Sequence, residues 1–170
     1  FVRPAKNLLA VFGNEILHIN LLGLKSNNST FGHRFESNSK PIKIINANDY
    51  EEKMLKEGNV IVDFDIRKNK IWDDILNVVN KLNKNFKVNS DEVLLNEVTA
   101  LVEMPNILIG KFDKKFLNIP PECLELTMKS NQKYFPILNE KDDITNNFVI
   151  VSNLKPKKLD FIIQGNEKVI

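Results

Sequence analysis

The stretch of residues 128–135, MKSNQKYF, is dense in amides and cations, a composition that neither core packing nor turn chemistry requires. Lysine ammonium groups bind phosphates, and side-chain amides hydrogen-bond to phosphate and sugar oxygens. Lys129, Gln132 and Lys133 are therefore predicted to contact RNA, the lysines through phosphates and Gln132 as a positioning group. A structural alternative stays open, because cations near the C-terminus of a helix also complement its dipole.

A second cluster, GHRF at residues 32–35, places an imidazole and a guanidinium after a polar loop. The guanidinium offers several N–H donors to a phosphate, and the imidazole suits a ribose contact or a positioning role. His33 and Arg34 therefore join the predicted RNA contacts. The alternative is a loop anchor in which Phe35 is buried and Arg34 pairs with a carboxylate.

Neither catalysis nor metal binding is predicted for any residue of the chain. His18 and His33 are the only histidines, and both lie too far in sequence from Cys123 to suggest a tetrahedral metal site. Cys123 sits among apolar residues and is expected to be a small buried side chain rather than a nucleophile. Asp63 and Asp65 precede a predicted helix, where carboxylates more often cap the helix than act as an acid/base pair.

The composition limits both the partners and the compartment. The formal net charge is only +2, so the chain is no polycation and any RNA contact must be local. A single cysteine excludes an internal disulfide framework, and no apolar stretch approaches the roughly 18 residues that a membrane-spanning helix needs. We expect a cytoplasmic protein without membrane contact.

The length of 170 residues suffices for one domain with a hydrophobic core, on a prior of roughly 100 to 200 residues per domain. No repeat or long linker divides the chain, so residues 1–170 are predicted to form a single domain. The chain has no starting Met and opens in an apolar run, so we expect an excerpt of a longer polypeptide.

Turn residues and apolar periodicity predict the elements of the first part of the chain. Gly13 and Asn14 are typical of a tight turn and predict a hairpin between residues 8–12 and 15–22. Asn48 is predicted to cap a helix that ends at Gly58. The remaining predictions are a polar loop at 25–30, a strand at 41–45 and a buried strand at 60–64.

The second part of the chain predicts further helices and strands, and their order mixes hairpins with helical crossovers. This order is typical of an α+β fold with mixed sheets and packed helices. Apolar residues at helical spacing also predict buried faces for the first two helices. The predicted elements are a helix at about 68–84 that buries Ile71, Ile75, Val78, Val79 and Leu82, a helix capped by Ser90 that buries Leu94, Val98, Leu101 and Val102 and stops at Pro105, an extended segment at 107–112, a helix from Pro120 to about 131, a hairpin of 134–138 with 148–151, and a last helix at 157–170.

A series of strings runs in order from end to end of the chain: FVRPAKNLLAVFG at 1–13, GHRF at 32–35, VIVDFDIR at 60–67, the segments 94–105, 110–124 and 128–136, FVIVSN at 148–153, and 165–170. This series resembles the beta subunit of bacterial tetrameric glycyl-tRNA synthetase. The chain departs from that family at Lys6 and Met104, where the family pattern has His and Trp.

The resemblance implies that the chain supports ATP-dependent glycyl-tRNA aminoacylation, with the ligase chemistry in a separate alpha subunit. It implies the alpha subunit and tRNA as partners in a heterotetramer, and ATP and magnesium as cofactors of the assembled enzyme. No cofactor is predicted in this segment, because a GxxxxGK phosphate loop is absent from the sequence.

The resemblance also implies a fold similar to the editing-type domain of the phenylalanyl-tRNA synthetase beta subunit. Editing is needed when a pocket cannot reject a smaller amino acid, and glycine has no smaller competitor. We therefore expect a scaffold and tRNA-facing module. The alternatives are a trans-editing hydrolase of mischarged tRNA and a purely structural subunit-interaction domain.

Overall fold

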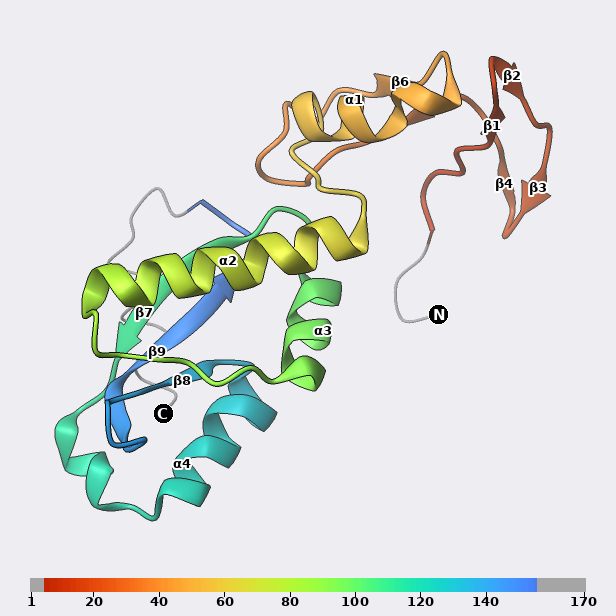
Figure 1. The fold of residues 1–170 in the computed structure, drawn as a ribbon. Helices are drawn as coiled ribbons and strands as arrows, with labels where there is room; N and C mark the ends of the chain where they lie inside the picture. The colour runs from red at the N-terminus through yellow and green to blue at the C-terminus, as the bar shows by residue number, and fades with distance from the viewer. Residues whose placement is uncertain (1–4, 156–170) are drawn as a thin grey trace. The chain divides into compact units, whose positions relative to one another are not determined.

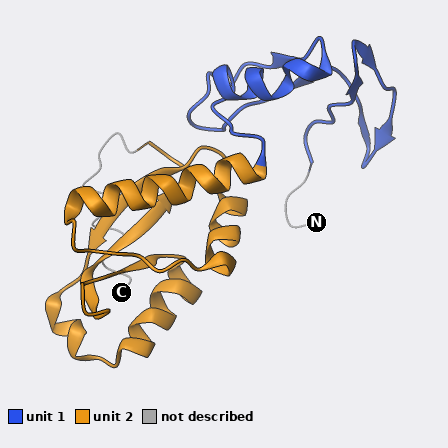
Figure 2. Cartoon of the chain, in the orientation of Figure 1, with its two compact units in different colours: residues 1–63 blue, residues 64–170 orange. Residues whose placement is uncertain are grey.

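A computed structural model describes residues 5–155 of the chain. Its residues cluster into two compact units, Phe1–Asp63 and Phe64–Ile170 (Figure 2). The single domain predicted for residues 1–170 stays a prediction. Each unit is described by itself. The helix predicted at 157–170 lies outside the described residues.

Unit 1 is built from short antiparallel strand pairs that precede one helix (Figure 1). The predicted turn at Gly13 and Asn14 is confirmed, and a further turn that the sequence did not predict forms at Leu22 and Gly23. The predicted polar loop at 25–30 contributes instead to two strands. The pairs are β1 (Val11–Phe12) with β2 (Glu15–Ile16), β3 (Asn20–Leu21) with β4 (Leu24–Lys25), and β5 (Ser29–Thr30) with β6 (Ile42–Lys43).

Helix α1 (Tyr50–Lys56) closes unit 1 over a small core. A 3-10 turn, Ala47–Asp49, leads into it, and the side chain that caps this turn is Asn46, which accepts the N–H of Asn48. The predicted cap was thus misplaced by two residues. The core consists of Ile42, Ile44 and Met54, with Leu9, Tyr50, Val60 and Val62 packed against it.

The predicted strand at 60–64 is wrong. These residues form no strand, and Phe64 already begins the following helix. Val60 and Val62 pack on the core of unit 1 in an irregular segment. A short apolar run indicates burial, but periodicity alone cannot separate a strand from another extended segment that packs into a core.

Unit 2 is organised around a three-stranded antiparallel sheet, with β9 between β7 and β8. The strands are β7 (Asn106–Lys111), β8 (Phe135–Leu138) and β9 (Ile144–Ser152). Both predicted extended regions are confirmed, and the predicted α+β class holds. Every named strand pair among residues 5–155 is antiparallel, so the predicted mixed sheets are not found there.

Helices cover both faces of this sheet, which explains why its strands are apolar at consecutive positions. One face, with Phe135, Ile137 and Val149, packs against α2 (Phe64–Leu82) and α3 (Glu92–Leu101). The other face, with Leu108, Phe148 and Ile150, packs against α4 (Pro121–Leu126) and the π-helix Thr127–Gln132 that continues it.

The glycine of β7 is explained by a close contact with a side chain of the neighbouring strand. Gly110 pairs with Phe148 of β9, and a Cβ at Gly110 would collide with the Phe148 ring. The ring of Tyr134 stacks on Phe148 with 4.8 Å between centroids. Gly110 therefore leaves the space that the aromatic core of this face occupies.

Four details of the predicted helices need correction. The cap of α3 is Asp91, whose carboxylate accepts the N–H of Leu94 at 3.0 Å, and not Ser90. Leu82, the last residue of α2, and Leu101, the last residue of α3, are exposed rather than buried. Cys123 is exposed as well, because α4 buries Leu124 instead.

Candidate nucleic-acid interface

The loop of residues 31–39, which follows β5, is fixed by a contact between two glycine backbones. A Cβ added at Gly32 would collide with the backbone of Gly58, just beyond the end of α1. The N–H of His33 donates to the carbonyl of Gly58 at 2.7 Å. The glycine of the GHRF string is thus needed for close packing of the loop on the end of α1.

His33 organises this loop from the inside. Its side chain is 1% exposed, and its Nδ1 accepts the backbone N–H groups of Phe35 and Glu36 at 3.2 and 3.1 Å. Its carbonyl accepts the hydroxyl of Ser37 at 2.7 Å. The burial of His33 supports a positioning role in this loop rather than a direct contact with a ligand.

Arg34 and Phe35 project outward, so the loop-anchor alternative does not describe this structure. Phe35 is 68% exposed rather than buried. The Arg34 guanidinium lies 5.3 Å from the centroid of the Phe35 ring, in the range of a cation–π interaction. Within residues 5–155 no carboxylate forms an ion pair with Arg34.

A cavity of about 690 Å³ in unit 2 and one of about 550 Å³ in unit 1 differ in charge. Among the described residues, Lys6 and Arg34 line the unit 1 cavity together with Phe31, and no carboxylate does. The described lining of the unit 2 cavity carries three carboxylates, from Glu125, Asp142 and Asp143, and one lysine, Lys129. The unit 1 cavity, lined also by Asn7, Thr30, Gly32, His33, Ser37 and Ser39, is therefore the one suited to an anion.

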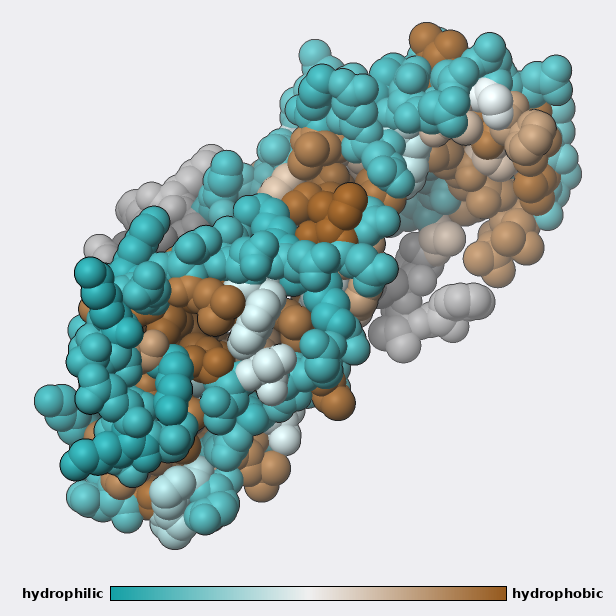
Figure 3. Space-filling model, viewed as in Figure 1, coloured by the Kyte–Doolittle hydropathy of each residue, from teal (hydrophilic) through white to brown (hydrophobic). Residues whose placement is uncertain are grey.

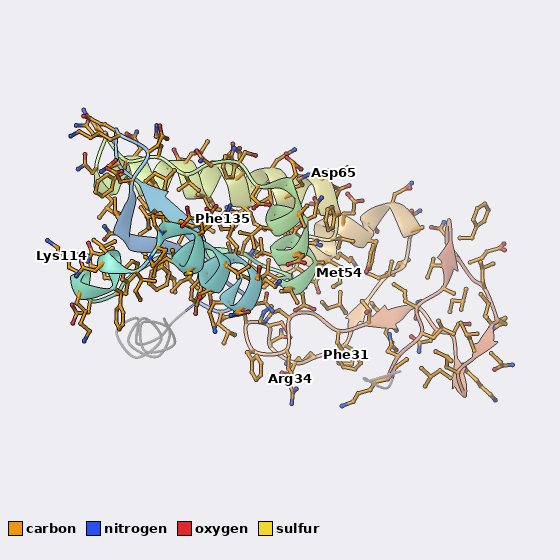
Figure 4. The ribbon with its side chains drawn as sticks, turned by 90° about the horizontal axis from the view of Figure 1, so that it is seen from below. Phe31, Arg34, Met54, Asp65, Lys114 and Phe135 are labelled. Carbon is orange, nitrogen blue, oxygen red and sulfur yellow. The ribbon has the colours of Figure 1, made fainter. Side chains whose placement is uncertain are left out.

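Figure 4 shows Phe31 and Arg34 pointing from the loop to the same side, away from α1, which carries Met54. Phe31 is 51% exposed. Sequence reasoning missed Phe31 and Lys6 as members of this site. The signal was present, because aromatic and basic residues alternate at Phe31, Arg34 and Phe35.

In unit 2, Lys129 extends from the π-helix between two carboxylates. Its ammonium lies 2.6 Å from Glu125 and 3.1 Å from Asp91. Burial lowers the pKa of Lys129, but hydrogen bonds to Glu125 and Asp91 outweigh this effect and raise the pKa above its usual value. The hydrogen bond from the Leu94 N–H is the main cause that lowers the pKa of Asp91, and Lys129 adds to it.

Lys133 ends the π-helix in a left-handed conformation, with φ +60°, and its ammonium lies 2.6 Å from Glu97 of α3. Gln132 precedes it and is half-buried. Both predicted phosphate-binding lysines thus connect the π-helix to α3. A phosphate must compete with carboxylates for either lysine, whereas at Arg34 it meets no such competitor among the described residues.

The five residues predicted to contact RNA fall into two places. His33 and Arg34 lie together in unit 1, and the other three, Lys129, Gln132 and Lys133, lie together in unit 2. Predicted contact with RNA stays a prediction for all five.

The remaining candidates do not come together. Asp63 precedes α2 and Asp65 lies in its first turn, while His18 lies in unit 1 and Cys123 in unit 2. In the part of the chain that the structure describes, no three His, Cys, Asp or Glu side chains group as metal ligands do. Over the same residues, no helix has the length and apolar character to cross a membrane.

Comparison with known proteins extends over the whole chain. The family model for the glycyl-tRNA synthetase beta subunit matches residues 1–170. Glycine–tRNA ligase beta subunits from Janthinobacterium sp. (strain Marseille) and Methylobacillus flagellatus are 46% and 47% identical over 170 residues. The corresponding subunit of Polaromonas naphthalenivorans is 45% identical over 170 residues. Each alignment covers 100% of this chain and 24% of the relative, so the chain spans about a quarter of their length. The chain therefore belongs to the family of glycyl-tRNA synthetase beta subunits.

Proposed function

We propose that this chain is part of the beta subunit of a glycine–tRNA ligase and serves it as a scaffold and tRNA-facing module. The ligase chemistry resides in the alpha subunit, and ATP and magnesium are used by the assembled, cytoplasmic enzyme. Family membership over residues 1–170 supports the proposal, as do the names of the relatives.

The observation that carries the tRNA-facing role is the cavity at the GHRF loop, in which none of the described lining residues is a carboxylate. Lys6 and Arg34 line it, and Arg34 has no carboxylate partner among the described residues. Phosphates supply most of the affinity of a protein for RNA, and cations without an internal partner are the groups able to bind them. In this proposal Arg34 binds a phosphate, while the buried His33 holds the loop in place.

The residues at the π-helix are less suited to bind RNA than Arg34 is. Lys129 and Lys133 already pair with carboxylates of α3 and α4, and exchanging a carboxylate for a phosphate gains little. The sequence-based prediction that Lys129, Gln132 and Lys133 contact tRNA stays a second hypothesis beside the one for Arg34. Its test is whether replacing both lysines by Ala changes tRNA affinity or only stability.

We also propose that the fold is related to the editing-type domain of the phenylalanyl-tRNA synthetase beta subunit, here used without hydrolysis. The α+β class of the described residues is compatible with this relationship. The assembled enzyme is expected to leave alanyl- and seryl-tRNA with the glycine anticodon intact. Deacylation that is lost on changing Asp63, Asp65 or His33 would support the trans-editing alternative instead.

The test measures tRNA binding and glycine-dependent pyrophosphate exchange with the assembled enzyme. Arg34→Ala should weaken tRNA binding and reduce the slope of log affinity against log salt by about one unit for one lost phosphate contact. Glycine-dependent pyrophosphate exchange should be unchanged, because that reaction needs no tRNA-facing loop. Lys25→Ala is the matched control, since Lys25 is an exposed cation of the same unit outside the cavity. Equal effects of the two variants would refute the proposal and leave a purely structural role.

A further inference from the structure

We propose that the loop of residues 31–35 is a stacking site for unpaired nucleotides of an RNA, in which Phe31 and Phe35 hold bases and Arg34 holds the phosphate between them. The proposal rests on the tRNA-facing role proposed above. It adds the class of RNA structure that the loop recognises.

The first argument is the exposure of two phenylalanines in five residues. Phe31 and Phe35 are 51% and 68% exposed, although a buried phenylalanine stabilises a fold. Neither belongs to a core cluster of the described residues. The fold of unit 1 therefore gains little from these rings, and a role in binding accounts for their presence.

The second argument is the rigidity of the loop that carries them. The packing of Gly32 on Gly58 and the hydrogen bonds of His33 fix the backbone on both sides of Arg34. The side-chain amide of Asn59 donates to the carbonyl of Glu36, the residue after Phe35, at 2.7 Å and holds the C-terminal side of residues 31–35 in place. Because the loop is ordered before it binds, little conformational entropy is lost on binding.

The third argument is the combination of charge and aromatic rings. Lys6 and Arg34 line the cavity beside Phe31, and no carboxylate joins them in the part of the lining that the structure describes, so the site favours a phosphate. The Arg34 guanidinium lies over the Phe35 ring and keeps N–H donors for a phosphate oxygen. Hydroxyls of Thr30, Ser37 and Ser39 in the lining suit ribose and phosphate oxygens.

These features select unpaired rather than paired RNA. A phenylalanine ring stacks on the face of a base, and in a duplex the base faces are covered by their neighbours. Stacking on aromatic side chains accepts every base, because each base has a π-face. The site therefore recognises an exposed single-stranded segment without reading its sequence.

The experiment measures the affinity of the assembled enzyme for glycine tRNA over a range of salt concentrations. Phe31→Leu and Phe35→Leu keep the apolar bulk and remove the ring. Each should weaken binding by about ten-fold, with an unchanged salt slope, because stacking releases no counterions. Phe35→Trp should retain the affinity, and the fluorescence of the new indole should be quenched by a short single-stranded RNA but not by a blunt RNA duplex.

The outcomes separate this proposal from the one on which it rests. If Arg34→Ala weakens binding and both leucine variants bind normally, stacking is refuted while the tRNA-facing role stands. If all three variants bind normally, both proposals are wrong. If the leucine variants disrupt assembly with the alpha subunit in the absence of RNA, the loop is a protein interface and stacking is refuted.

Discussion

Replacing Asp91 by Ala should destabilise unit 2, because this one carboxylate caps α3 and also pairs with the π-helix. Its oxygen accepts the Leu94 N–H at 3.0 Å, and a second oxygen lies 3.1 Å from the Lys129 ammonium. Loss of a helix cap costs about 1 kcal/mol. Loss of the partly exposed ion pair adds up to about 1 kcal/mol. We expect the free energy of unfolding to fall by about 1 to 2 kcal/mol.

The assay is urea unfolding followed by the fluorescence of Trp72, the only tryptophan of the chain, which packs against the core that α2 and α3 share. Asp91→Asn keeps an oxygen that can cap the helix and should lose only the ion-pair contribution. Ser90→Ala is the matched control, and its effect should stay within about 0.5 kcal/mol. If Ser90→Ala costs as much as Asp91→Ala, the cap lies at Ser90 and the reasoning fails.

The same residue gives a pH dependence whose sign follows from its lowered pKa. The stability that ionised Asp91 contributes is fully present above 3.8, the ordinary pKa of an aspartate, and is lost as the pH falls through the lower folded-state pKa. Unfolding at a series of pH values should therefore show a difference between the wild-type chain and Asp91→Asn that disappears in acid. A difference that grows as the pH falls would contradict the assigned sign.

Three further changes test the packing and the turns. Gly110→Ala should lower the free energy of unfolding of unit 2 by about 1 to 3 kcal/mol, because the added Cβ would collide with the Phe148 ring. Urea unfolding followed by Trp72 fluorescence measures this change. Leu22→Asn should raise the thermal stability of unit 1, because Leu22 has φ +54° and a leucine in this conformation costs about 1 to 2 kcal/mol; an unchanged or lower midpoint, followed by circular dichroism, would refute the strain. Replacing Lys129 and Lys133 together by Ala should lower the stability of unit 2 and leave tRNA affinity unchanged, and a loss of affinity with normal stability would restore the sequence-based prediction of phosphate contacts.

Leu22 also belongs to an exposed apolar surface on unit 1. Phe12, Leu21 and Leu22 are all more than half exposed. Figure 3 shows hydrophobic residues gathered at the end of unit 1 that β1 to β4 form. Small hairpins bury little surface on their own, so the leucine at this turn is not explained by the stability of the hairpin.

The sequence was sufficient where a pattern has one structural meaning. Ile71, Ile75 and Val79 recur at helical spacing and are buried in α2 as predicted. The extended segments at β7, β8 and β9 were predicted from apolar runs, but the position of β7 beside β9 depends on a pairing between residues far apart in the chain. The predicted buried strand at 60–64 shows the limit, because Ile61 is buried and Val60 and Val62 are partly buried, whereas Phe64 is exposed and no strand forms.

The candidate site was harder to predict because it depends on tertiary contacts. Both GHRF and MKSNQKYF contain cations, and nothing local shows that Lys129 meets Asp91, the cap of α3, or that Lys133 meets Glu97. The packing of Gly32 on Gly58 and the hydrogen bond from the His33 N–H to the Gly58 carbonyl join residues that are remote in sequence, and no local pattern predicts this contact. The sequence shows Phe31 and Phe35 close to Arg34, but it does not show that their rings are exposed, because a phenylalanine is more often buried.

The most direct test of the tRNA-facing role is photocrosslinking from position 35 in the assembled enzyme. A photoreactive phenylalanine analogue replaces Phe35, and the same analogue at Val93 serves as a control, because Val93 is exposed on α3 and outside the cavity. The analogue at position 35 should crosslink to glycine tRNA at an unpaired nucleotide, whereas the analogue at position 93 should give no crosslink to RNA. Crosslinks from position 35 only to protein, or equal RNA crosslinks from both positions, would contradict the account.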